Sequence, residues 1–355
     1  MRIDLSIAGS ALALAIAAGM ATPAAALVSD AVVERAGADL VLRWTARAPV
    51  DVLEAQRPDA DAGQAQLVSR GDRDGKATVP ADPARRSYFL LRDTGDGSVT
   101  RVAERLVPLE QGSNFRDIGG YPGADGKHVR WGMIYRSGAT AMLTPQDVAM
   151  VGQLGLKQMI DLRSSEERVL APTKIDGVPY TAVGYSMKTI LASMKSPGGV
   201  PQNGGTLYRN LPTMLAPQMK LLFAALLSKQ GPVEYNCSAG QDRTGFATAM
   251  ILSALGTPRD VILQDYHLST RYRQTEFEMP PIDPAAHPND PVAAMFARSS
   301  APHSATPLKD PDGKAFLASA FEEIDAKWGS PEGYLQQVVG LTPIDIASLR
   351  ATYLE

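Results

Sequence analysis

The chain has 355 residues, of which 45% are hydrophobic, and its formal net charge at pH 7 is -3. Domains commonly span about 100–200 residues, so this length favours two domains with at least one sizeable core. The small net charge and the lack of a basic run disfavour a nucleic-acid-binding surface, and the composition is typical of a globular protein.

Residues 1–26 are typical of a secretory signal peptide. Arg2 opens a short charged region, an apolar stretch runs from Leu5 to Met20, and Ala24–Ala26 supplies small residues for cleavage. An uncleaved membrane anchor is the alternative, but the stretch is short and rich in Ala and Gly. We therefore expect the segment to be removed and the mature protein to be exported, either to the periplasm or as a secreted protein, with no integral membrane segment.

A small β-sandwich-like domain is predicted for residues 27–108. Short apolar alternating segments are separated there by Gly, Asp and Pro clusters, as at residues 71–75, which is typical of antiparallel strands. The expected strands include Leu40–Trp44, Val50–Leu53, Tyr88–Leu91 and Val99–Val102. This spacing is similar to that of a fibronectin type III module. No group of residues in it looks catalytic, so we expect a spacer or docking role.

From residue 109 to residue 355 the pattern changes to alternating strands and helices. This alternation predicts an α/β domain with a largely parallel central sheet flanked by helices. Strands are expected at residues 157–162 and 233–236, and helices at residues 145–154, 214–228, 244–255 and 316–354, the last one interrupted at 329–333. Residues 280–313 are rich in Pro, Asp, Ala and Ser and lack periodicity, which predicts a surface loop or lid.

Cys237 is the only cysteine of the chain, so no disulfide can form within it. A lone thiol in an oxidising compartment is open to oxidation, which favours a chemical reason for its retention. It follows the expected strand Val233–Asn236, and after five intervening residues Arg243 opens an expected helix. The alternative is a core cysteine with Arg243 on the helix surface.

The segment between Cys237 and Arg243 is predicted to bind phosphate. Its backbone N–H groups and the helix N-terminus would form a concave anion site, and the same field would favour the thiolate, which is the form that attacks phosphorus. Arg243 offers a planar fork to two phosphate oxygens. Gly240 can close the loop without steric cost. The residues expected to contact phosphate are Ser238, Ala239, Gly240, Gln241, Asp242 and Arg243.

These residues resemble the bacterial tyrosine/serine phosphatases of the cysteine-dependent protein tyrosine phosphatase superfamily, the group related to the secreted mycobacterial tyrosine phosphatase. The loop of that family reads H-C-x-A-G-K-D-R-T-G, and residues 236–245 read N-C-S-A-G-Q-D-R-T-G. Further motifs of the family are matched in order by Asn114–Tyr121, Tyr135–Gly138, Asp161–Ser164 with Glu167-Arg168, Asp265-Tyr266 with Ser269, and the end of the chain from Tyr334-Leu335 to Tyr353-Leu354.

The resemblance covers roughly residues 110–355. It implies the protein-tyrosine-phosphatase-like fold and a metal-independent hydrolysis of protein phosphotyrosine through a phosphocysteine on Cys237. Dual specificity, with phosphoserine or phosphothreonine also accepted, is compatible with it. The expected partner is thus a phosphorylated protein or peptide, or a phosphorylated small molecule, and not a nucleic acid.

Two positions depart from the family's loop. Asn236 stands where the family has His, and an Asn side chain can hydrogen-bond the backbone but carries no charge. Gln241 replaces a Lys, whose charge would favour multiply phosphorylated ligands such as phosphoinositides. A phosphoinositide or other small-molecule phosphatase, and a catalytically weak phosphate-binding module, are the alternative functions.

The leaving group needs a proton donor within hydrogen-bond reach. Residues 177–233 contain no Asp or Glu, which excludes a general acid from that stretch. Asp242 inside the loop is the preferred acid, with bracing of the loop as its alternative role. Asp161 and Asp117 are the next candidates.

The remaining motif residues are expected to support the site. Thr244 would hydrogen-bond the thiolate or cap the helix. A buried ion-pair network would brace the loop through Arg116, Asp117, Arg136, Asp161 and Arg163. Four scattered histidines, at positions 128, 267, 287 and 303, have no ligand spacing, and no nucleotide-binding motif precedes a helix, so no metal and no cofactor is expected.

Overall fold

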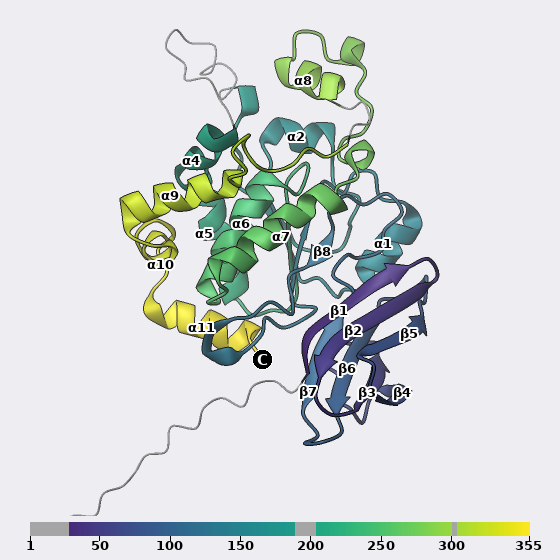
Figure 1. Ribbon diagram of the computed structural model, residues 1–355. Coiled ribbons are helices and arrows are strands. Elements are labelled where there is room, and N and C mark those ends of the chain that lie inside the picture. Colours follow the sequence, from purple (N-terminus) through teal and green to yellow (C-terminus); the bar gives the residue numbers. More distant parts are fainter. Residues whose placement is uncertain (1–27, 189–203, 300–303) are drawn as a thin grey trace, which may run out of the picture.

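The computed structural model describes residues 28–188, 204–299 and 304–355 (Figure 1). The expected signal peptide, residues 1–26, lies outside the described residues. Within the described ranges no helix is long and apolar enough to cross a membrane. The chain forms an antiparallel β region followed by a larger α/β region, as the sequence predicts.

Residues 28–103 form two antiparallel sheets that pack face to face. The three-stranded sheet has the order β1-β2-β5 and the four-stranded sheet the order β4-β3-β6-β7. The strands are β1 Val28–Ala36, β2 Asp39–Ala46, β3 Val50–Ala55, β4 Gln66–Asp72, β5 Lys76–Pro80, β6 Tyr88–Asp93 and β7 Val99–Ala103. In β2 every second side chain is buried, namely Leu40, Leu42 and Trp44, and this alternation holds the sheet against its partner. The sandwich prediction is confirmed, although β1, β4 and β5 were not expected.

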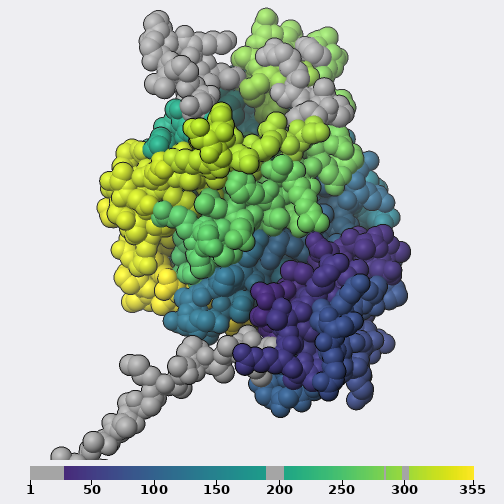
Figure 2. All heavy atoms as spheres, in the orientation of Figure 1, coloured from purple at the N-terminus to yellow at the C-terminus, as the bar shows by residue number. Residues whose placement is uncertain are grey.

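The sandwich lies directly against the α/β region, without a gap in the space-filling view (Figure 2). Arg86, just before β6, donates hydrogen bonds from Nη1 to Oδ2 of Asp117 at 2.9 Å and to the hydroxyl of Tyr135 at 3.0 Å. Trp131 from the α/β region packs into the core of the sandwich, and its Nε1 donates to the carbonyl of Arg101 at 3.1 Å. The two regions therefore share buried apolar surface and a buried ion pair.

The α/β region is built on one five-stranded sheet with the order β11-β10-β12-β9-β8. Its strands are β8 Arg116–Asp117, β9 Ile134–Ser137, β10 Gln158–Asp161, β11 Tyr180–Ala182 and β12 Val233–Asn236. All neighbours are parallel except β8, which is antiparallel to β9. Every residue of β12 is buried, as expected for a strand between two parallel neighbours and covered on both faces.

Helices surround this sheet, and α6 and α7 lie across one side of it in Figure 1. Within the described residues the α-helices are α1 Pro145–Gly152, α2 Ser165–Leu170, α4 Gly204–Met214, α5 Ala216–Leu227, α6 Asp242–Ala254, α7 Arg259–Tyr272, α8 Pro291–Ser299, α9 Phe316–Trp328, α10 Pro331–Tyr334 and α11 Pro343–Tyr353. Short 3-10 turns occur at Ala124–Gly126, Thr275–Phe277 and Pro284–Ala286, and a π-helical turn at Leu335–Val339.

Three sequence-based expectations differ from this structure. Residues 280–313 are not a plain loop, because they contain the turn Pro284–Ala286 and helix α8, which packs near α2. Helix α4 was missed, since Gly-rich residues precede it and Pro212 lies inside it. The C-terminal helical stretch is broken not only at Gly329 but also at Gly340, both of which have left-handed backbone angles.

Candidate active site

The candidate site lies where the central strand β12 ends and helix α6 begins. Cys237 directly follows β12 and is only 2% exposed, and α6 starts five residues later at Asp242. The strand pairs in parallel with β10 on one side and β9 on the other. The expected strand–loop–helix arrangement is therefore present, with the thiol at the carboxyl edge of the sheet.

The backbone of the loop is polarised. Its carbonyl groups are bound from outside: that of Ser238 accepts from the amide of Ala139, and those of Ala239 and Gly240 accept from Nδ2 of Asn114. Among the residues that the structure describes, by contrast, none of the amides from Ser238 to Arg243 donates a hydrogen bond. Outward carbonyls and unpaired amides at a helix N-terminus form an anion-binding cradle.

Gly240 is required by the close approach of the loop to the preceding strand. Its φ is +62°, and a Cβ at this position would lie 2.6 Å from the backbone of Ser137 and from the amide nitrogen of Gly138. Any other residue would collide with main-chain atoms and would be strained as well.

Two buried arginines brace the loop from below. Nη2 of Arg136 donates to the carbonyl of Gly240 at 2.7 Å, and Arg116 hydrogen-bonds Oδ1 of Asn114, the residue that holds the loop carbonyls. Both arginines pair with Asp265 of α7, at 2.6 Å and 3.2 Å. Burial alone would raise the pKa of Asp265, but the two arginines hold it well below its usual range. Arg136 therefore contacts the loop directly, and Arg116 contacts it through Asn114.

Arg243 is held by a carboxylate that sequence analysis did not assign to the site. Oε2 and Oε1 of Glu167 accept from its Nη1 and Nη2, each at 2.7 Å, and the hydroxyl of Tyr185 accepts a second bond from Nη1 at 2.6 Å. Glu167 also accepts from the hydroxyl of Ser238 at 2.6 Å. It is placed by a capping box, in which Ser164 and Glu167 exchange hydrogen bonds at the start of α2.

The charge of Arg243 stabilises the ionised form of Glu167. Burial raises the pKa of that carboxyl. The charge and hydrogen bonds of Arg243, together with hydrogen bonds from the Ser238 hydroxyl and the Ser164 amide, outweigh burial and lower the pKa to about 2. A guanidinium has five N–H donors, and these contacts use three of them. The Nε–H and one Nη2–H remain on the other edge, where they can bind two oxygens of a phosphate.

Asp242 lies in the first turn of α6 and carries the only carboxylate of the loop. Its Oδ1 accepts from the hydroxyl of Tyr208 at 2.6 Å and from Nε2 of Gln241 at 3.2 Å. The hydroxyl of Tyr266 donates in turn to that of Tyr208 at 2.7 Å. Oδ2 has only a 3.5 Å contact with the same Gln241 amide, so this oxygen is the one that can exchange a proton.

The two other candidate acids are engaged in buried ion pairs. Asp161 binds Arg163 through both oxygens, since Oδ1 accepts from Nε at 3.0 Å and Oδ2 accepts from Nη2 at 2.6 Å, and Oδ2 also accepts from the hydroxyl of Tyr180. Asp117 is fixed by Arg86 and by the amides of residues 119 and 132. These residues belong to separate clusters and not to the single network that the sequence predicts, and Asp117 serves the contact with the sandwich.

The remaining predicted residues lie beside the loop. Thr244 is fully buried, and its Oγ1 has no hydrogen-bond partner within the described residues, which leaves it able to bind a thiolate or phosphate oxygen. Asn236 is buried at the end of β12, and its carbonyl accepts from the amide of Leu162.

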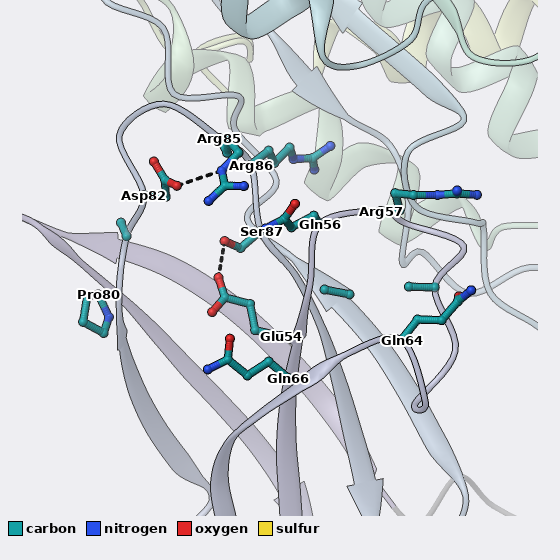
Figure 3. A pocket seen from close by; sticks show the side chains of 13 residues that line it. Glu54, Gln56, Arg57, Gln64, Gln66, Pro80, Asp82, Arg85, Arg86 and Ser87 are labelled. Atoms are coloured by element: carbon teal, nitrogen blue, oxygen red, sulfur yellow. Dashed lines mark hydrogen bonds and ion pairs between the residues drawn. The ribbon is translucent and has the colours of Figure 1, made fainter.

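No cluster of three or more possible metal ligands occurs in the part of the chain that the structure describes. A cavity of about 720 Å³ opens in the sandwich, between the end of β3 and the residues after β5 (Figure 3). Its lining includes Glu54, Gln66, Arg85 and Ser87, and none of its residues belongs to the loop around Cys237. It is therefore separate from the candidate site.

A model of the tyrosine phosphatase family matches residues 107–355. The chain belongs to this family. A protein of Cupriavidus necator that carries the name tyrosine-protein phosphatase is 30% identical over 299 residues, which is 81% of this chain and 98% of that protein. The triple specificity protein phosphatase PtpB of Mycobacterium tuberculosis is 28% identical over 278 residues, covering 68% of this chain and 96% of PtpB.

Among solved structures, TpbA of P. aeruginosa matches 55% of this chain and 89% of its own, with 15% identity and a TM-score of 0.23. A score this low does not bear on the arrangement of the fold. The family indicated by the separated sequence motifs is confirmed by the family model and by the two relatives.

Proposed function

We propose that this chain is a cysteine-dependent protein-tyrosine phosphatase that hydrolyses phosphotyrosine through a phosphocysteine intermediate on Cys237. The observation that carries the proposal is the loop from Ser238 to Arg243, whose amides have no acceptor within the described residues and which closes around the only thiol of the chain. Such a cradle matches a phosphate dianion, and family membership supports the same reaction.

In the first step the thiolate of Cys237 attacks phosphorus, and the bond from phosphorus to the leaving oxygen breaks. The loop amides and the free edge of Arg243 bind the three equatorial oxygens, on which charge is spread in the transition state. Asp242 gives its proton to the leaving phenolate or alkoxide. The products are the free alcohol and the phosphocysteine.

In the second step water attacks the phosphocysteine and the sulfur–phosphorus bond breaks. Asp242, now ionised, accepts a proton from the attacking water. The unpaired hydroxyl of Thr244 is available to stabilise the departing thiolate. Inorganic phosphate leaves, and both groups return to their starting protonation states.

The substrate class is a phosphorylated protein or peptide, with phosphotyrosine preferred. PtpB is named as a triple specificity protein phosphatase, so phosphoserine and phosphothreonine peptides are suitable comparison substrates. Asp242 lies next to Arg243 at the phosphate cradle, so it can donate a proton to both aryl and alkyl leaving groups.

The test is the variant Cys237→Ser on purified protein with a phosphotyrosine peptide. Turnover should fall to background, while the peptide still binds with nearly unchanged affinity in calorimetry, because the amide cradle does not depend on sulfur. An acid-quenched reaction of the wild type should contain phosphate bound covalently to Cys237. Turnover by the Ser variant close to that of the wild type would overturn the mechanism.

We also propose that the protein is exported. Support comes from Arg2, the apolar stretch Leu5–Met20 and the small residues Ala24–Ala26, which together have the form of a signal peptide. Expression of the full chain in a Gram-negative host should give a periplasmic or secreted product whose N-terminal sequence starts near Leu27. A product retained in the cytoplasm with Met1 intact would contradict export.

A further inference from the structure

Another arginine, which was not expected from the sequence, lies against the loop from Ser238 to Arg243. Arg273 follows helix α7, and its side chain is 10% exposed. Its Nη1 donates to Oε1 of Gln241, the loop residue that stands where the resembling family has Lys. A positive charge is therefore present beside this position, although it comes from a distant part of the chain.

The charge of Arg273 is matched by Glu278. Nε and Nη2 of Arg273 each lie 2.7 Å from one carboxylate oxygen of Glu278, which is the bidentate geometry of a strong pair. Oε1 of Glu278 also accepts from the hydroxyl of Ser113 at 3.0 Å, so the carboxylate is fixed from two sides. The Glu278 side chain is 11% exposed.

Arg273 is close enough to the reacting groups to affect them. Burial alone would lower the pKa of Arg273, but the hydrogen bonds and charge of Glu278 outweigh it, and the negative charges of Asp242 and Cys237 raise it further. Because its Nη1 is hydrogen-bonded to Gln241 of the loop, the guanidinium also lies within electrostatic range of Cys237. The carboxylate of Glu278 lies at the same edge of the site.

We propose that the Arg273–Glu278 pair determines the charge selectivity of the active site. Arg273 replaces the missing Lys charge next to Gln241, and Glu278 masks that charge. The site therefore prefers substrates whose phosphate has no second anionic group nearby, such as singly phosphorylated peptides, over doubly phosphorylated peptides and polyphosphorylated inositol lipids. This inference rests on the proposed phosphatase function.

The test compares four proteins: the wild type, Glu278→Gln, Arg273→Gln and the double variant. Each is assayed on two peptides of the same sequence, one carrying phosphotyrosine alone and the other carrying a phosphoserine next to it. The measured quantity is the ratio of kcat/KM for the doubly to the singly phosphorylated peptide. Gln retains the shape of both side chains, and in Glu278→Gln it can still accept the hydrogen bond from Ser113.

Glu278→Gln should raise the ratio about two- to fivefold, because it unmasks one positive charge several ångströms from the second phosphate. Arg273→Gln should lower it by a similar factor, because Glu278 is then uncompensated. The double variant should return close to the wild-type ratio. Both changes in the ratio should shrink at high salt, because ions screen the interaction of this pair with a second phosphate.

A purely structural role would lower kcat/KM for both peptides equally and leave the ratio constant, and that outcome overturns the proposal. If Glu278→Gln does not fold, Gln241→Lys serves in its place, because it adds one positive charge next to Arg273. An unchanged ratio of kcat/KM for the two peptides in that variant also overturns the proposal. The phosphatase function is judged separately, by the dependence of wild-type turnover on Cys237. If the kcat/KM ratio is constant but turnover depends on Cys237, the proposed charge selectivity is refuted and the phosphatase function is not.

Discussion

The pair of Glu167 and Arg243 allows a quantitative prediction for the variant Glu167→Gln. Glu167 is fully buried, binds Arg243 through both oxygens and accepts from the hydroxyl of Ser238. Glutamine keeps the size of the side chain but loses the negative charge and one acceptor. Arg243 would then lose its ion-pair partner, and the loop would lose the group that orients it.

The size of the effect follows from the pKa of the carboxyl. It falls from an ordinary value of 4.5 to about 2 in the folded protein. With about 1.4 kcal/mol for each pKa unit, the ionised form of Glu167 contributes about 3 kcal/mol to the free energy of unfolding at neutral pH. Loss of one partner of a buried pair costs about 3–5 kcal/mol, which agrees with this figure.

The contribution has a defined pH window. Because the folded pKa lies below the unfolded one, the stabilisation is fully present above pH 4.5 and is lost as the pH falls through 2. Calorimetry of the wild type and of Glu167→Gln should therefore show a destabilisation of about 3 kcal/mol at pH 7, and less than half of that at pH 3. We also expect kcat/KM on a phosphotyrosine peptide to fall by about 10–100-fold, because Arg243 is no longer held in position.

Glu234 offers a matched control, and it lies in β12, the strand that leads to Cys237. It is also fully buried, but burial raises its pKa to about 8, with Ser137 as its only described hydrogen-bond partner. At pH 7 the folded protein thus holds Glu234 protonated, and Glu234→Gln should not lower stability at that pH. Two results would refute the conclusion that Glu167 is ionised and Glu234 protonated. One is an equal destabilisation by Glu167→Gln at pH 7 and pH 3, and the other is the same loss of unfolding free energy for Glu167→Gln and Glu234→Gln at pH 7.

Three further predictions concern the acid, the thiol and the sandwich. Asp242→Asn should slow hydrolysis of phosphotyrosine by about 10²–10⁴-fold but affect p-nitrophenyl phosphate less, because nitrophenolate is the better leaving group; equal losses would indicate a bracing role. Asp161→Asn is its control and should lower stability more than it alters this leaving-group dependence. Chelators should leave activity unchanged, whereas peroxide should abolish activity by oxidising Cys237. Loss of activity in EDTA, with recovery on adding a divalent metal, would contradict the mechanism. Arg86→Met should cost about 3–5 kcal/mol by leaving Asp117 buried and unpaired, and a thermal unfolding curve like that of the wild type would show that this pair does not hold the sandwich in place.

The features that sequence analysis predicted correctly are local in the chain. The strand Val233–Asn236, the loop and helix α6 are contiguous, so strand residues, a glycine and a helix start indicate them directly. The same holds for the alternating strands of the sandwich. By contrast, helix α8 was taken for loop because Pro and Asp residues around it hide its period.

The partners that hold the loop could not be derived from spacing, because they come from distant segments. Glu167 lies 76 residues before Arg243, and Asn114 lies 126 residues before Gly240. Glu167 and Asn114 were visible within family motifs, but their contacts were not. Tyr208 and Arg273 gave no signal in the sequence, because a single Tyr or Arg outside a motif has many possible roles.

Arg243 and Arg273 are each neutralised by a carboxylate that binds them through two oxygens, Arg243 by Glu167 and Arg273 by Glu278. The charges of Arg243 and Arg273 are therefore largely cancelled, although Arg243 keeps two donors for phosphate. The positive field that Glu167 and Glu278 do not neutralise comes from the backbone amides of the loop, from the N-terminus of α6, and from Arg116 and Arg136, which share the single carboxylate of Asp265. This arrangement explains how Gln241 can stand in place of a Lys without loss of the phosphate cradle, because the cradle is made by the main chain. The main chain would then provide phosphate binding, whereas the Arg273–Glu278 pair would determine which phosphorylated substrates are preferred.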